Sequence, residues 1–152
     1  MYIYSPNADA YLCVNKINSH VYFEPMDTLT NSPDFCWEHW DLETDRDGNR
    51  RLVYYLNNSK RSIAWFKPSN GPKTSDFHCA YLHDHANRVF GDRICTIDCD
   101  QLFLKSPGQE YVVFPSASLP LHPLVVSKHE SIAEAPDAFR VEMFAELPHS
   151  LK

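Results

Sequence analysis

Two histidines and two cysteines in the second half of the chain are residue types that bind zinc. His83 and His85 flank Asp84, and Cys95 and Cys99 follow closely. Imidazole and thiolate are good zinc ligands, but the cysteine pair has no matching second pair. Two histidines that share one face of a strand are equally typical of a solvent-facing edge. We therefore expect no bound metal, and a metal-dependent enzyme built on these four ligands is the less favoured alternative.

No other catalytic arrangement is recognisable. None of the cysteines lies in an activating sequence such as a Gly-rich turn leading into a helix. The carboxylates of residues 38–45 form a run that is typical of a solvated loop or strand edge. With only four glycines in the chain, a phosphate-cradling Gly-rich loop is not expected. We predict a protein that is not an enzyme, with no catalytic residues and no cofactor. The cysteines are Cys13, Cys36, Cys79, Cys95 and Cys99.

A basic segment stands out in an acidic chain. The formal net charge is −6, yet residues 60–74 contain Lys60, Arg61, Lys67 and Lys73 and no carboxylate. Residues 1–45 hold eight carboxylates against one lysine, whereas residues 46–73 hold seven Lys or Arg against one aspartate. A local basic block in an acidic protein predicts a patch for an anionic partner rather than general nucleic-acid affinity. Ammonium groups beside amides suit sulfate or phosphate, although a solubilising loop is the alternative.

Short strands separated by turns are expected to position this segment. Aromatic and β-branched runs predict strands, and Asn and Gly between them tolerate the positive φ of tight hairpin turns. No helical period is found in residues 1–85. This rhythm predicts an all-β barrel or sandwich. The expected strands are 2–4, 11–14, 21–23, 35–40, 52–55 and 62–66, and the expected turns are 5–7, 15–18, 47–49 and 57–58, with a loop at 68–72.

Residues 86–152 differ from the first part of the chain. Strands are expected within 94–104 and 111–114, followed by a Ser/Pro-rich linker at 116–123. Asp137 is placed to cap a short helix through Leu147, which Pro148 would end. We expect two parts, a β-domain at 1–85 and a C-terminal extension at 86–152.

Targeting signals are sparse. No run approaches the length of a transmembrane helix, so no membrane insertion is expected. Met1 is followed at once by a strand-like stretch rather than by a signal peptide. The prediction from this is either a cytosolic protein or a chain whose start is missing. Asn57 opens an Asn-Asn-Ser glycosylation sequon, which has meaning only for a secreted chain.

Several stretches in residues 1–82 resemble, in order, motifs of the fibroblast growth factor family. Ile3, eight residues before Tyr-Leu-Cys-Val-Asn at 11–15, resembles a strand followed by Tyr-Leu-Cys-Met-Asn. Cys36 with Leu42 and Glu43 resembles the next strand. Tyr54-Tyr55 falls near the place of the family's Tyr-Asn-x-Tyr segment, and Ile63-Ala64 resembles its Tyr-Val-Ala-Leu strand. Gly71-Pro72-Lys73-Thr74 resembles its Gly-Pro-Lys-Thr loop, and the stretch from His78 to Leu82 resembles its closing His-Phe-Leu strand.

The resemblance implies a β-trefoil that is a secreted signalling ligand. It implies heparan sulfate binding through Lys60, Arg61, Lys67 and Lys73, and a fibroblast growth factor receptor-type tyrosine kinase as partner. The receptor face would include Tyr54, Tyr55, Tyr81 and Leu82, and Cys13 and Cys36 would be core thiols rather than a disulfide. A different trefoil or small-barrel binding module, of lectin or inhibitor type and without receptor signalling, is the alternative.

The sequence also departs from the family. The resemblance begins partway into the family domain, so the first strands of the trefoil are expected to be missing and the trefoil to be partial. A barrel without them exposes unpaired edges unless the tail supplies replacements. Trp40 stands where many members have a receptor-contacting Glu, and residues 86–152 match nothing in the family.

Overall fold

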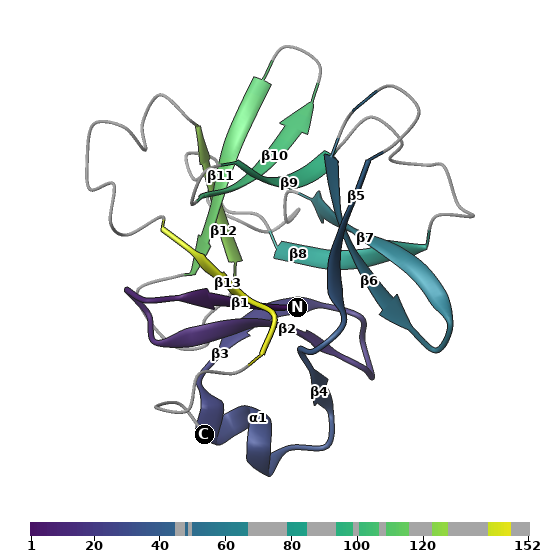
Figure 1. Cartoon of the computed structure of the whole chain (residues 1–152), viewed down its shortest axis with the longest axis vertical. Helices are drawn as coiled ribbons and strands as arrows, with labels where there is room; N and C mark the ends of the chain where they lie inside the picture. The colour runs from purple at the N-terminus through teal and green to yellow at the C-terminus, as the bar shows by residue number, and fades with distance from the viewer. Residues whose placement is uncertain are drawn as a thin grey trace.

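The chain is built almost entirely from antiparallel β-strands. The computed structural model describes residues 1–44, 48, 50–66, 79–84, 94–98, 101–106, 109–115, 123–127 and 140–146, with side-chain surroundings for 1–44, 48, 50–63, 97 and 140–146. In these residues it contains thirteen strands and one short helix (Figure 1). The expected all-β class is confirmed.

The strands form three sheets of neighbouring strands. The first contains β13 (Glu142–Phe144), β1 (Tyr2–Ser5), β2 (Ala10–Asn15) and β3 (Val21–Glu24) in that order, with β4 (Phe35–Cys36) also paired to β2. The second contains β5 (Trp40–Thr44), β6 (Arg50–Leu56), β7 (Ser59–Phe66) and β8 (Cys79–Asp84). The third contains β9 (Ile94–Asp98), β10 (Gln101–Ser106), β11 (Gln109–Pro115) and β12 (Pro123–Ser127). In the second and third sheets, sheet order follows sequence order, and each strand is antiparallel to the next.

Three hairpin turns fall where the sequence predicts them. Asn57 and Asn58 have φ values of 52° and 62°, and Gly48 has a φ of 82°. Such values suit the tight turns whose twist matches the flanking strands, and Asn and Gly adopt them at low cost. In the β2–β3 turn, the Asn15 side chain accepts hydrogen bonds from the backbone N–H groups of Ile17 and Asn18 at 2.9 and 3.3 Å. These local bonds stabilise the β2–β3 hairpin.

The last described strand pairs with the first. Glu142–Phe144 runs antiparallel to β1, with Tyr4 opposite Glu142 and Tyr2 opposite Phe144, and the two lie side by side in Figure 1. The helix expected from Asp137 to Leu147 is therefore wrong over this stretch, because the free edge of β1 recruits it as a strand. The boundary expected after residue 85 stays a prediction, although Val141 and Ile97 share a core with the first two sheets.

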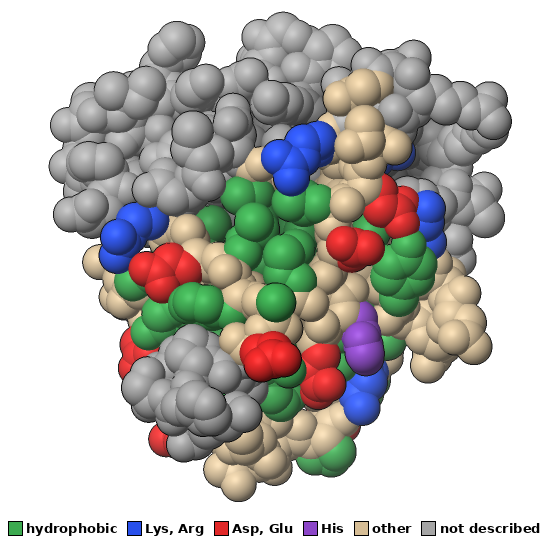
Figure 2. Space-filling view, viewed as in Figure 1, with side chains coloured by type: hydrophobic (Ala, Val, Ile, Leu, Met, Phe, Trp, Pro, Cys, Tyr) green, Lys and Arg blue, Asp and Glu red, His purple; other side chains and the backbone are tan. Residues whose placement is uncertain are grey.

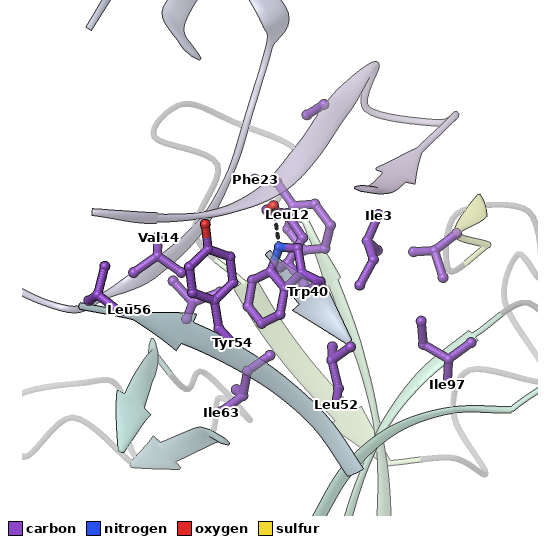
Figure 3. Close-up of a cluster of buried hydrophobic side chains, with 13 residues drawn as sticks. Ile3, Leu12, Val14, Phe23, Trp40, Leu52, Tyr54, Leu56, Ile63 and Ile97 are labelled. Atoms are coloured by element: carbon purple, nitrogen blue, oxygen red, sulfur yellow. Dashed lines mark hydrogen bonds between the residues drawn. The ribbon is translucent and has the colours of Figure 1, made fainter. Parts of the chain in front are cut away.

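One core joins the three sheets. Its largest fully buried side chains include Trp40, Tyr54 and Phe23 (Figure 3). The Trp40 indole N–H donates a buried hydrogen bond of 2.9 Å to the Leu12 carbonyl, so β5 is tied to β2 by a polar as well as an apolar contact. Burying each such side chain contributes about 1.5–3 kcal/mol, so this cluster is the main source of stability in the described region.

A second apolar cluster lies on the other face of the first sheet. Tyr11 and Cys13 are buried there beneath Leu29 of α1 (Met26–Asn31). The expectation of no helix in residues 1–85 is wrong at this point, since Leu29 gains burial that only the folded sheet provides. Cys36 lies opposite Val14 in the register and packs on the first core, whereas Cys13 faces the second cluster. Because they lie on opposite faces, both are free thiols, as expected.

Candidate functional site

The β6–β7 hairpin carries most of the described candidate residues and divides them between two faces. Tyr54 lies opposite Arg61, and Tyr55 lies opposite Lys60. Successive residues of a strand point to opposite faces, and directly opposed residues share a face. Tyr54 and Arg61 are therefore on the inward side of the hairpin, and Tyr55 and Lys60 are on the outward side.

Tyr54 belongs to the core. Its side chain has 0% of its surface exposed, and its ring contacts Trp40 edge-on at a centroid distance of 4.8 Å. Its hydroxyl points toward Val14 (Figure 3) and has no hydrogen-bond partner among the described residues. Burial raises the pKa of this hydroxyl, and the nearby Cys36 thiol adds to the effect. The expected receptor contact at Tyr54 is corrected, because a fully buried side chain offers no surface to a partner.

Tyr55 and Lys60 meet at one carboxylate on the outward face. The Tyr55 hydroxyl donates to Glu43 Oε1, and Lys60 Nζ lies 2.5 Å from Glu43 Oε2. The Glu43 hydrogen bond raises the pKa of both the Tyr55 hydroxyl and the Lys60 ammonium. Tyr55 remains 39% exposed, so its ring is available to a partner. The positive charge of Lys60, in contrast, is partly neutralised before any anion arrives.

Arg61 connects the hairpin to the β2–β3 turn. Its NH1 group donates to the Ser19 hydroxyl at 3.3 Å, and Ser19 has a φ of 62° within that turn. Its Nε is buried and has no hydrogen-bond partner among the described residues. Lys60 and Arg61, adjacent in the sequence, thus lie on different faces and form no joint patch by themselves. On the face seen in Figure 2, the described Lys and Arg side chains stand apart, with Asp and Glu among them.

The remaining candidate residues for glycan binding, receptor binding and glycosylation are described in less detail. Tyr81 and Leu82 lie in β8, with their backbones opposite Ala64 and Ile63. Lys67 and Lys73 lie outside the described residues. Asn57 lies at the exposed tip of the β6–β7 turn, where its sequon is sterically accessible.

Two of the four possible zinc ligands lie within the described residues. His83 lies in β8 opposite Ser62, and Cys95 lies in β9 opposite Leu104, whereas His85 and Cys99 fall outside the described residues. Within the part of the chain that the structure describes, no group of three or more His, Cys, Asp or Glu side chains is placed to hold a metal. Among the same residues, no helix is long and apolar enough to cross a membrane.

A pocket of about 450 Å³ opens beside the hairpin. It lies between the β6–β7 turn, the β2–β3 turn and the end of β4. Sequence reasoning missed four of its residues, Lys16, His39, Leu56 and Asn58, as members of a site. The signal for Lys16 was its isolation as the one cation of residues 1–45, whereas nothing in the sequence sets His39 apart. The lining residues are Lys16, Cys36, His39, Tyr54, Tyr55, Leu56, Asn57 and Asn58.

Comparisons with protein-family models, with curated proteins and with solved structures each find no match to this chain.

Proposed function

We propose that the chain is a growth-factor-like signalling ligand, secreted, with a β-trefoil fold, that binds sulfated glycan and a receptor tyrosine kinase of the fibroblast growth factor receptor type. The single observation that carries the proposal is the division of the strands into three consecutive sets of about four. A trefoil consists of three four-stranded units around one core.

The closure of the first sheet supports a trefoil assembled from an unusual starting point. The motifs resemble the family from partway into its domain, and an incomplete barrel would leave β1 with a free edge. β13 pairs with that edge, and the set β9–β12 adds a third group of strands, with β9 against β6 and β7. The C-terminal half of the chain thereby contributes one strand to the first sheet and all four strands of the third.

Glycan binding is assigned to the basic residues Lys60, Arg61, Lys67 and Lys73. Because Lys60 shares Glu43 and Arg61 is turned toward the Ser19 hydroxyl with a buried Nε, we expect each of them to contribute less than an unpaired surface cation would. Receptor binding is assigned to Tyr55, the exposed tyrosine of the hairpin, together with Tyr81 and Leu82. Aromatic side chains that are partly exposed on a rigid hairpin are frequent sources of binding energy.

Retention on immobilised heparin in a salt gradient tests the glycan part. The variant in which Lys60, Arg61, Lys67 and Lys73 are all changed to Gln should elute at clearly lower salt, because each charge-assisted contact that is lost weakens binding about tenfold. A matched control, Arg50→Gln with Arg140→Gln, removes exposed charges elsewhere and should elute close to the native protein. Equal elution of the fourfold variant and the native protein would remove glycan binding at this block.

Binding of receptor ectodomain separates the proposal from its nearest alternative. A protein that is retained by heparin but binds no receptor ectodomain would instead be a glycan-binding module of trefoil type. A folded protein that binds neither would leave only the all-β architecture standing.

A further inference from the structure

The pocket between the two hairpin turns has preformed walls. In the β2–β3 turn, the Asn15 N–H donates to the His20 carbonyl at 2.9 Å, and the Ser19 N–H donates to the Asn15 carbonyl at 2.8 Å. Arg61 then links this turn to β7 through the Ser19 hydroxyl. On the opposite wall, Asn57 and Asn58 are held at positive φ in a tight turn. Walls fixed in this way bind a ligand without a large ordering cost.

The charge of the pocket is opposite to that of the chain. Its lining contains the Lys16 ammonium and no carboxylate, although the chain as a whole has a formal net charge of −6. Burial raises the pKa of the Cys36 thiol at the floor, with Glu38 adding to this effect and Lys16 opposing it, so the thiol stays neutral and does not repel an anion. The lining therefore favours an anionic ligand.

The remaining groups suit a polyhydroxylated molecule. The side-chain amides of Asn57 and Asn58 can both donate to and accept from hydroxyl groups. Tyr55 and Leu56 offer apolar surface to the C–H face of a sugar ring, and the His39 ring is supported edge-on by Tyr54 at a centroid distance of 5.9 Å. A volume of about 450 Å³ is in the range of pockets for small organic molecules and exceeds what a single ion needs.

We propose that this pocket binds one acidic sugar unit, that is, a saccharide that carries a sulfate or carboxylate group. Lys16 binds the anionic group, and the two asparagine amides bind the hydroxyls. The site is separate from the proposed glycan-binding block, because its residues are not those of the basic segment. It can bind a sugar even if that block binds none. The sugar is either a free small saccharide or a unit within a longer chain.

Isothermal titration with a trisulfated heparin disaccharide tests the site. The native protein should bind this disaccharide more tightly, by about tenfold or more, than it binds inorganic sulfate or the unsulfated disaccharide. Lys16→Gln should weaken binding by about tenfold, since one charge-assisted contact is lost. The matched control is Arg50→Gln, which removes an equal charge from an exposed side chain outside the pocket and outside the basic segment, and which should change binding less than twofold.

A second variant keeps the test valid if a substitution disturbs the turn. Asn58→Gly removes the amide but retains the positive φ, so the hairpin is preserved while binding weakens. Unchanged binding in both Lys16→Gln and Asn58→Gly would overturn the proposal, as would equal affinity for inorganic sulfate. Loss of binding in Lys60→Gln but not in Lys16→Gln would assign the sugar to the basic segment instead.

A heparin decasaccharide distinguishes the two sources of the sugar. If the pocket accepts a unit within a chain, Lys16→Gln weakens decasaccharide binding by the same factor as disaccharide binding. If it accepts only a free saccharide, the Lys16 effect is confined to the disaccharide. Either pattern supports the site, and the absence of a Lys16 effect on both ligands contradicts it.

Discussion

The inward and outward faces of the β6–β7 hairpin each carry a tyrosine, and the two tyrosines lie in different environments. Tyr54, on the inward face, is fully buried against Trp40, and its hydroxyl has no hydrogen-bond partner among the described residues, whereas Tyr55, on the outward face, is partly exposed and bonded to Glu43. Tyr54 thus contributes to the core, and Tyr55 offers a surface to partners, although Val53 on the same side of the strand as Tyr55 is also buried.

The largest effect that this comparison predicts is at Tyr54. Tyr54→Ala should lower the free energy of unfolding by about 3–5 kcal/mol, because it leaves a cavity beside Trp40. Tyr55→Ala should change it by no more than about 0.5 kcal/mol, since the side chain is at the surface. Urea denaturation followed by Trp fluorescence measures both. Equal losses at the two positions would break the distinction between the faces.

Tyr54→Phe sharpens the same comparison. It keeps the ring in the core and removes only a buried hydroxyl that has no hydrogen-bond partner among the described residues. The stability should be unchanged or higher by up to about 1 kcal/mol. A clear loss of stability in Tyr54→Phe would mean that the hydroxyl is bonded in solution.

The C-terminal strand extends the comparison to a second element. Val141 is 3% exposed and lies in the main core, whereas Met143 is 42% exposed. Val141→Ala should cost about 2 kcal/mol and Met143→Ala less than about 0.5 kcal/mol. If both substitutions are silent in thermal unfolding, the C-terminal strand does not belong to the folded core.

The turn that sets the hairpin register should respond to backbone conformation. Asn58→Ala places a residue with a Cβ at a φ of 62° and should cost about 1 kcal/mol. Asn58→Gly should cost little, because Gly adopts this φ freely. Thermal unfolding of the two variants side by side measures the difference, and a more stable Ala variant would contradict the turn geometry.

The smallest expected effect concerns the Tyr4 hydroxyl, which donates to Asp9 at 2.6 Å. This bond raises the pKa of Tyr4 to about 12, above its ordinary value of 10.0. Its stabilisation is therefore complete below pH 10 and is lost as the pH rises through about 12. The stability difference between native protein and Tyr4→Phe should shrink across this window, as measured by urea denaturation. The stability difference between native protein and Asp9→Asn, which lacks the carboxylate, should shrink in the same way. A difference that stays constant with pH would contradict the role given to this hydrogen bond.

Features encoded locally could be predicted from the sequence. The turns at Asn15–Asn18, around Gly48 and at Asn57–Asn58 are where their residue types predict them. Gly48, Asn57 and Asn58 adopt positive φ themselves, whereas in the first turn the Asn15 side chain binds the backbone and the positive φ is at Ser19. Features that depend on distant segments could not be predicted. The short helix depends on burial of Leu29 against the first sheet, and the last strand depends on the free edge of β1.

The candidate site shows the same limit at the scale of single residues. Their adjacency in the sequence predicts a joint basic patch of Lys60 and Arg61, but the two-residue period of a strand places them on opposite faces. The pocket could not be found from the sequence at all, since Lys16, His39 and Asn58 come together only when the two hairpin turns lie side by side.

The most direct test of the account is the binding of the receptor-type kinase ectodomain, measured by surface plasmon resonance with heparin present. We expect the native protein and Tyr54→Phe to bind with the same affinity. Tyr55→Ala should bind at least about tenfold more weakly while remaining folded, because it removes an exposed aromatic contact. A folded native protein that does not bind, or a Tyr55→Ala variant that binds as tightly as the native protein, would contradict the proposed function.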